Sequence, residues 1–62
     1  MTTRPFALYE ASALRERGYQ DGLEGRSKIE GMSMAREKAG EEGVAAYMVG
    51  WRRGDEERRN AA

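Results

Sequence analysis

The sequence predicts an all-α fold in which two main helices form a hairpin, are joined by a partly helical connector, and pack closely through glycine-containing faces. Small and apolar residues recur at spacings of three and four in two separate segments, as they do on one face of a helix. A pentad of the form Gly-aromatic-x-x-Gly occurs in both segments. A chain of 62 residues, 39% of them hydrophobic, has room for one thin core. We therefore expect a single domain, 1–62, with a helix over about 3–25, a connector over about 26–40 and a helix over about 41–59.

The first helix is predicted to begin with Thr3 as its N-cap and Pro5 in its first turn, where a missing backbone N–H is tolerated. Its buried side combines a strip of small residues with the larger Leu8, Tyr19 and Leu23. The small and apolar strip consists of Ala7, Ala11, Leu14, Gly18, Gly22 and Gly25.

The connector has weaker periodicity, and Gly31 and Gly40 are expected to break it. Ser27 and Glu30 stand at the spacing of a capping box, and Ser33 is a candidate cap for a short helical turn. We therefore expect the connector to be helical only in part.

The second helix is predicted to begin with Glu41 and Glu42, which suit the positive end of the helix dipole. It ends with Arg58 and Arg59 near the negative end. Trp51 lies beside the stripe of this helix, which consists of Gly43, Tyr47, Gly50 and Gly54.

The pentads at 18–22 and 50–54 carry most of the information in the sequence. A glycine inside a helix costs about 0.5–1 kcal/mol relative to alanine, so four of them cost roughly 2–4 kcal/mol. Close approach of the two helix backbones would offset that cost, and we predict that the two glycine stripes face each other. The alternative is that Gly22 and Gly54 are merely C-caps. The predicted seam comprises Gly18, Tyr19, Gly22, Gly25, Tyr47, Gly50, Trp51 and Gly54.

Trp51 is expected to be the largest apolar anchor of the hairpin, because an aromatic residue beside small residues at helical spacing is usually core. The alternative is an exposed platform on which Tyr19 or Trp51 stacks with a nucleobase.

Composition excludes several classes of function. The chain has no cysteine and no histidine, and its net charge is +0. Disulfides, thiolate catalysis, the usual zinc sites and an imidazole base are therefore absent, and no general field attracts polyanions. We expect no catalytic residue, metal, cofactor, small-molecule substrate or membrane partner, and a cytoplasmic location, since no apolar window approaches eighteen residues and no leader is readable.

Charged residues have two interpretations. Three i, i+4 pairs, Arg17 with Asp21, Arg53 with Glu57 and Asp55 with Arg59, neutralise each other on the helix surface. The residues that fit this pattern least lie in the connector and next to Trp51, and are candidates for a patch that contacts phosphates. They are Arg26, Lys28, Arg52 and Arg53.

The run at 17–28, Arg-Gly-Tyr-Gln-Asp-Gly-Leu-Glu-Gly-Arg-Ser-Lys, followed by Gly-Trp-Arg at 50–52, resembles the ribosome modulation factor family of small bacterial proteins. The resemblance covers about residues 13–59 and implies two helices joined by a connector. It also implies ribosome hibernation, in which the protein binds ribosomal RNA and proteins of the small subunit and promotes inactive ribosome dimers. The positions that match the family pattern are Arg17, Tyr19, Arg26, Ser27, Lys28, Trp51 and Arg52.

Two hypotheses from different classes follow. The first is a non-enzymatic, ribosome-associated factor of the stress response that silences translation, with the binding residues Arg17, Arg26, Ser27, Lys28, Arg52 and Arg53. The second is a small inhibitor of the phage or mobile-element type that uses the same scaffold to bind a host protein. Neutral charge favours the second, because acidic residues oppose RNA binding. An enzyme is the least supported class, and self-association would bury surface that a thin core leaves exposed.

Overall fold

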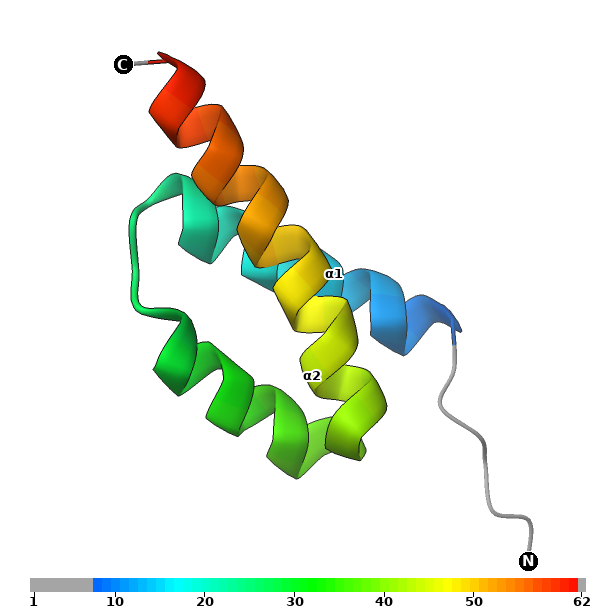
Figure 1. Cartoon of the computed structure of the whole chain (residues 1–62). Helices are drawn as coiled ribbons and strands as arrows, with labels where there is room; N and C mark the ends of the chain where they lie inside the picture. Colours follow the sequence, from blue (N-terminus) through cyan, green and yellow to red (C-terminus); the bar gives the residue numbers. More distant parts are fainter. Residues whose placement is uncertain (1–7, 62) are drawn as a thin grey trace, which may run out of the picture.

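The computed structural model describes residues 8–61, which form two helices, α1 (Leu8–Leu23) and α2 (Lys28–Ala61) (Figure 1). The described residues contain no strand, and the two helices pack against each other. The prediction of an all-α fold with two packed helices is therefore confirmed. The predicted Thr3 cap, Pro5 and Ala7 lie outside the described residues.

The first helix ends in a backbone motif centred on Gly25. The Gly25 N–H donates to the Gly22 carbonyl at 3.1 Å, and the Arg26 N–H donates to the Asp21 carbonyl at 2.9 Å. This pair of bonds is the Schellman motif, which needs a left-handed residue, and Gly25 has a φ of 74°. The assignment of Gly25 to the seam is wrong, because this glycine is exposed and terminates α1.

The second helix starts directly after Ser27, whose Oγ accepts the Ile29 N–H at 3.2 Å as an N-cap does. Its regular geometry is interrupted at Ala39 and at Gly40, where φ is 67° and ψ is −152°. The expectation that Gly40 interrupts the helical periodicity is thus confirmed. Gly31 and Ser33, by contrast, lie inside the helix and neither break nor cap it, so those two predictions are wrong.

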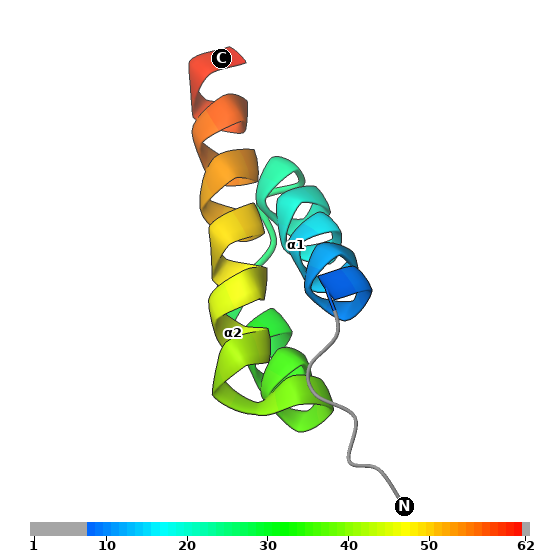
Figure 2. The same cartoon turned by 90° about the vertical axis from the view of Figure 1, so that its right-hand side faces the viewer.

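The break at Ala39 and Gly40 reverses the chain. The first part of α2, 28–38, leads back along the molecule, and the second part, 41–61, crosses α1 (Figure 1 and Figure 2). Gly18 faces Tyr47 and Trp51, whereas Gly22 faces Trp51 and Asp55, so α1 and the second part run in the same direction. The predicted connector, 26–40, is mostly this returning helical segment.

The core is small and consists mainly of alanine and one aromatic ring. Five hydrophobic residues are buried: Ala11, Leu14, Ala35, Ala46 and Tyr47. Partly buried side chains surround them, among them Met32, Met34, Met48 and Trp51. Side-chain packing of this kind is too thin to explain the fold alone, so the backbone contact between the helices matters correspondingly more.

Backbone packs on backbone where α1 crosses α2. A methyl group added to Gly22 would stand 2.7 Å from the Asp55 nitrogen, and one added to Gly54 would stand 2.8 Å from the Leu23 nitrogen. Methyl groups on Gly18 and Gly50 would lie 2.9 Å from the Trp51 and Tyr19 nitrogens. The predicted seam between the two pentads is therefore confirmed, and the alternative that Gly22 and Gly54 are C-caps is wrong.

The main aromatic anchor is Tyr47. It is 0% exposed and is the largest fully buried side chain of the described residues, while Trp51 is only partly buried. Gly31 makes room for it, because a Cβ there would overlap the Tyr47 ring. The assignment of this role to Trp51 is wrong, because Trp51, one turn further along α2, is only partly buried.

Candidate functional site

A buried polar chain joins the second part of α2 to α1. The Tyr47 hydroxyl, carried by the second part of α2, donates to Asp21 Oδ2 on α1 at 2.6 Å. Asp21 is 7% exposed, and its other oxygen lies 3.4 Å from Arg17 Nε. Burial and the hydrogen bond to Asp21 raise the pKa of Tyr47 well above its ordinary value of 10.0, so the phenol stays protonated.

Sequence reasoning placed Asp21 on the surface and so missed this chain. The predicted pair of Arg17 and Asp21 is present. Its carboxylate is buried and accepts the Tyr47 hydroxyl, so the pair does not belong to a solvated helix face alone. The signal was available, because Asp21 follows Gly18 by three residues and so lies on the glycine face of α1.

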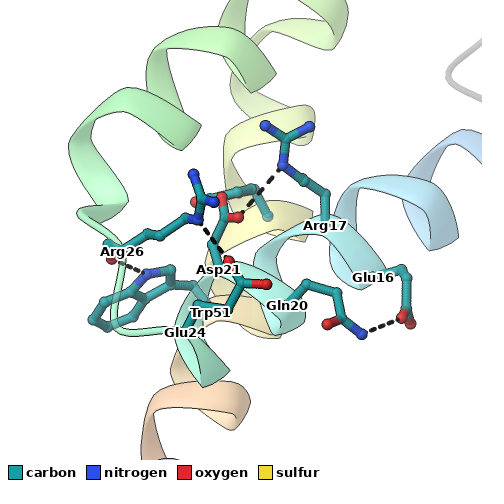
Figure 3. A network of polar contacts seen from close by, with 8 residues as sticks. Glu16, Arg17, Gln20, Asp21, Glu24, Arg26 and Trp51 are labelled. Atoms are coloured by element: carbon teal, nitrogen blue, oxygen red, sulfur yellow. Dashed lines mark hydrogen bonds and ion pairs between the residues drawn. The ribbon is translucent and has the colours of Figure 1, made fainter.

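Residues from two sequence blocks, 17–28 and 50–52, meet at Trp51. The Trp51 Nε1–H donates to the Arg26 carbonyl at 3.0 Å (Figure 3). Lys28 Nζ lies 5.2 Å from the centre of the Trp51 ring. A cation at that distance over an indole is attracted by the ring quadrupole. We call Arg26, Ser27, Lys28 and Trp51, together with Arg52, which follows Trp51 by one residue and so lies about 100° further around α2, the Trp51 corner.

The charges of the Trp51 corner are unequally available. Arg26 Nε lies 2.6 Å from Glu24 Oε1, and this pairing raises the pKa of Arg26 (Figure 3). Among the described residues, Lys28 and Arg52 form no ion pair, and both are exposed. Lys28 is therefore the cation beside Trp51 that no described carboxylate holds, and Arg52, one residue further along α2, is a second exposed cation without such a pair.

Arg53 and Tyr19 lie away from the Trp51 corner. Arg53 follows Trp51 by two residues, which places it about 200° around α2. Its Nε lies 3.5 Å from Glu57, which also accepts the Tyr19 hydroxyl at 2.6 Å. That hydrogen bond raises the pKa of Tyr19. The predicted set of binding residues is thus divided between two sides of the molecule.

Asp55 anchors a second group of charges at the end of the seam. It is 8% exposed, pairs with Arg58, and lies 3.0 Å from Arg59 Nε. Arg58 Nε also donates to the Gly22 carbonyl at 3.1 Å, which gives this carbonyl a second donor besides the Gly25 N–H. The predicted pair of Asp55 and Arg59 is present, and the tie from Arg58 to α1 is an addition that spacing alone could not reveal.

An open depression of about 380 Å³ lies along one edge of the seam. Its floor is Gly50, and exposed Val49 and Arg53 stand beside it on α2. The part of its lining that α1 contributes is Ser12, Arg15, Glu16 and Tyr19. Arg15 Nη2 donates to Ser12 Oγ at 3.3 Å, and Gln20 donates to Glu16 at 3.0 Å. We call this surface the Gly50 depression.

Within residues 8–61, no group of three acidic side chains is arranged to hold a metal ion. Neither α1 nor α2 is both long and apolar enough to cross a membrane. No family model, no curated protein and no solved structure matches this chain.

Proposed function

We propose that this protein is a non-enzymatic factor that associates with the small ribosomal subunit and silences translation, with the Trp51 corner as its RNA contact. One observation carries the proposal: residues of the blocks 17–28 and 50–52, whose sequences resemble the ribosome modulation factor family, lie together at this corner. Residues 25 positions apart in the sequence, Trp51 and Arg26, are joined by a hydrogen bond. A short helical protein with a local cationic corner fits a ligand that is recognised by its phosphates.

The corner offers RNA two kinds of contact. Lys28 and Arg52 supply charge for phosphate oxygens, and neither is held by a carboxylate of the described chain. The Trp51 ring is partly exposed, and the Lys28 ammonium, at the end of a flexible side chain, lies 5.2 Å from its centre. A base that displaced Lys28 would gain the ring face, while the ammonium moved to the neighbouring phosphate.

The test is co-sedimentation with ribosomes on a sucrose gradient. We expect wild-type protein in the fractions of the small subunit and of ribosome dimers, with binding that weakens steeply as salt rises. The double variant Lys28→Glu/Arg52→Glu should remain at the top of the gradient. Arg36→Glu/Lys38→Glu carries the same charge change on exposed residues of the returning segment and should sediment as wild type does. Equal sedimentation of the two variants would overturn the proposal.

A second candidate function is inhibition of a host protein. The observation that favours it is the balance of charge: most arginines whose neighbours are described are paired with a carboxylate, as are Arg17, Arg53 and Arg59. Such a surface has little net attraction for polyanions but can match the charges of a protein partner. Salt-insensitive binding to a purified host protein, with no ribosome association, would support this function instead.

A further inference from the structure

Glu24 is an acidic residue beside the Trp51 corner that contributes little to the stability of the fold. It directly follows α1, at the negative end of the helix dipole, where a carboxylate is unfavourable. Its Oε1 lies 2.6 Å from Arg26 Nε (Figure 3). Both side chains are largely exposed, and an exposed ion pair adds little to the free energy of unfolding. Helix stability therefore does not account for a carboxylate at this position.

The backbone holds both members of this ion pair in place. The Glu24 N–H donates to the Gln20 carbonyl at 3.0 Å, and the Arg26 N–H donates to the Asp21 carbonyl at 2.9 Å. The Arg26 carbonyl in turn accepts the indole N–H of Trp51. Main-chain hydrogen bonds thus fix the positions of Glu24 and Arg26, so the fold itself brings their side chains within reach of each other.

A carboxylate and a phosphate bind a guanidinium in the same way, through oxygen atoms that accept its N–H groups. Glu24 therefore occupies the part of Arg26 that an RNA phosphate would need. Lys28 differs, because no carboxylate of the described residues forms an ion pair with it. The two cationic residues that contact Trp51 are thus unequal: Lys28 is available to a ligand, whereas Arg26 becomes available only when Glu24 is displaced.

We propose that Glu24 lowers the affinity of the Trp51 corner for RNA by competing with a phosphate for Arg26. This inference rests on the proposed function, and it names the residue that sets how tightly the same site binds. In the free protein, the chain itself supplies the anion that Arg26 holds. Binding exchanges the carboxylate for a phosphate, and the displaced carboxylate then repels the neighbouring phosphates.

The experiment is a titration of the full-length protein with a short oligouridine, followed by the fluorescence of Trp51, the only tryptophan of the chain. We expect Glu24→Gln to raise the affinity about threefold, as for the release of one exposed ion pair. The slope of log affinity against log salt should steepen by about 0.7, because one more phosphate of a single strand is neutralised. A change in the stability of the fold alone would not alter this slope.

Two matched variants separate the ion pair from a general effect of charge. Glu37→Gln removes the same charge from an exposed residue of the returning segment and should raise the affinity less than Glu24→Gln does. In an Arg26→Gln background, Glu24→Gln should bring no more gain than Glu37→Gln, since no guanidinium is then released. Equal gains for Glu24→Gln and Glu37→Gln, an unchanged salt slope, or a full gain without Arg26 would each overturn the proposal.

These outcomes are distinguishable from those of the ribosome experiment, which depends on Lys28 and Arg52. Ribosome association that is lost in Lys28→Glu/Arg52→Glu, together with equal oligouridine affinity of Glu24→Gln and wild type, would overturn the role of Glu24 alone. Absence of any fluorescence change in both wild type and Glu24→Gln would overturn the proposed RNA contact, and with it the role of Glu24.

Discussion

The two contacts that hold the molecule together differ in what they are made of. At the seam, Gly22 and Gly54 bring backbone onto backbone, and the partner atoms are amide nitrogens and carbonyls that cannot rotate away. At Tyr47, a whole aromatic side chain fills the space over Gly31 and ends in a hydrogen bond to Asp21. The seam depends on the absence of side chains, whereas the Tyr47 contact depends on the largest side chain that is fully buried.

This difference teaches where the fold can be altered. A side chain can be shortened, and the loss of stability is then graded by the atoms removed. A backbone contact cannot be shortened, so any added atom separates the helices. We therefore expect any added side chain in the seam to unfold the protein, whereas shortening Tyr47 should lower the free energy of unfolding in proportion to the atoms removed.

The largest effect is expected for Gly54→Ala. The added methyl would lie 2.8 Å from the Leu23 nitrogen, so α1 must move as a body. Alanine gains about 1 kcal/mol in helix propensity, but overpacking of a fixed backbone costs roughly 3 kcal/mol or more, which rivals the whole stability of a domain this small. Circular dichroism should show loss of the cooperative thermal transition. An unchanged melting temperature would show that the helices do not touch at this glycine.

Tyr47→Ala should come next, with a loss of about 3–5 kcal/mol in the free energy of unfolding, as for other large buried aromatics. Tyr47→Phe removes only the hydroxyl and leaves Asp21 buried with Arg17 as its remaining partner. We expect a loss of about 1–3 kcal/mol, which urea denaturation can measure. Equal stability of Tyr47→Phe and wild type would mean that the hydrogen bond at 2.6 Å contributes nothing.

The same tyrosine predicts a dependence on pH. Because the pKa of Tyr47 in the fold lies above the ordinary 10.0, the folded state holds the phenol proton more tightly than the unfolded state. This contribution is fully present below pH 10 and is lost as pH rises toward the folded pKa. Wild type should therefore lose stability in alkaline urea melts more steeply than Tyr47→Phe. Parallel curves would remove Tyr47 as the cause.

These two regions also mark how far the sequence could predict the fold. The seam followed from helical spacing and the cost of glycine, since Gly18 and Gly50 have no other reason to lie inside helices. The Tyr47 contact did not follow, because it depends on Gly31, which a local pattern identifies only as a helix breaker. Its role becomes apparent only when the returning segment lies beside the second part of α2.

The candidate site, too, could be predicted only in part. Arg26, Lys28, Arg52 and Arg53 were predicted to form one patch near Trp51, and the structure places the first two against Trp51. Arg53 was grouped with Arg52 because they are neighbours in the chain, but one residue along a helix turns the side chain by about 100°. Adjacency in the sequence of a helix therefore does not by itself place two residues in one patch, and this holds for Arg52 beside Trp51 as well as for Arg53 beside Arg52.

Trp51→Ala should cost less than Tyr47→Ala, at about 2 kcal/mol, because the indole is partly exposed and its removal leaves an opening to solvent rather than a closed cavity. The variant should stay folded and lose one hydrogen bond, to the Arg26 carbonyl. Circular dichroism and urea melts measure the loss. Complete unfolding would return the role of main anchor to Trp51.

The smallest effect is expected at Gly25, and it separates a capping glycine from a seam glycine. Gly25 has a φ of 74°, and its nearest neighbour is the flexible Arg58 side chain, 3.5 Å from an added methyl. Gly25→Ala should therefore cost only the strain of a left-handed residue, about 1 kcal/mol, and Gly25→Asn should cost less because asparagine tolerates that conformation. At Gly22, three residues earlier, both substitutions should abolish the folded state, since either side chain meets the α2 backbone. Thermal melts of the four variants provide the measurement. If asparagine rescued Gly22 as it does Gly25, the contact at Gly22 would be a matter of backbone conformation, and the seam would end at Gly18.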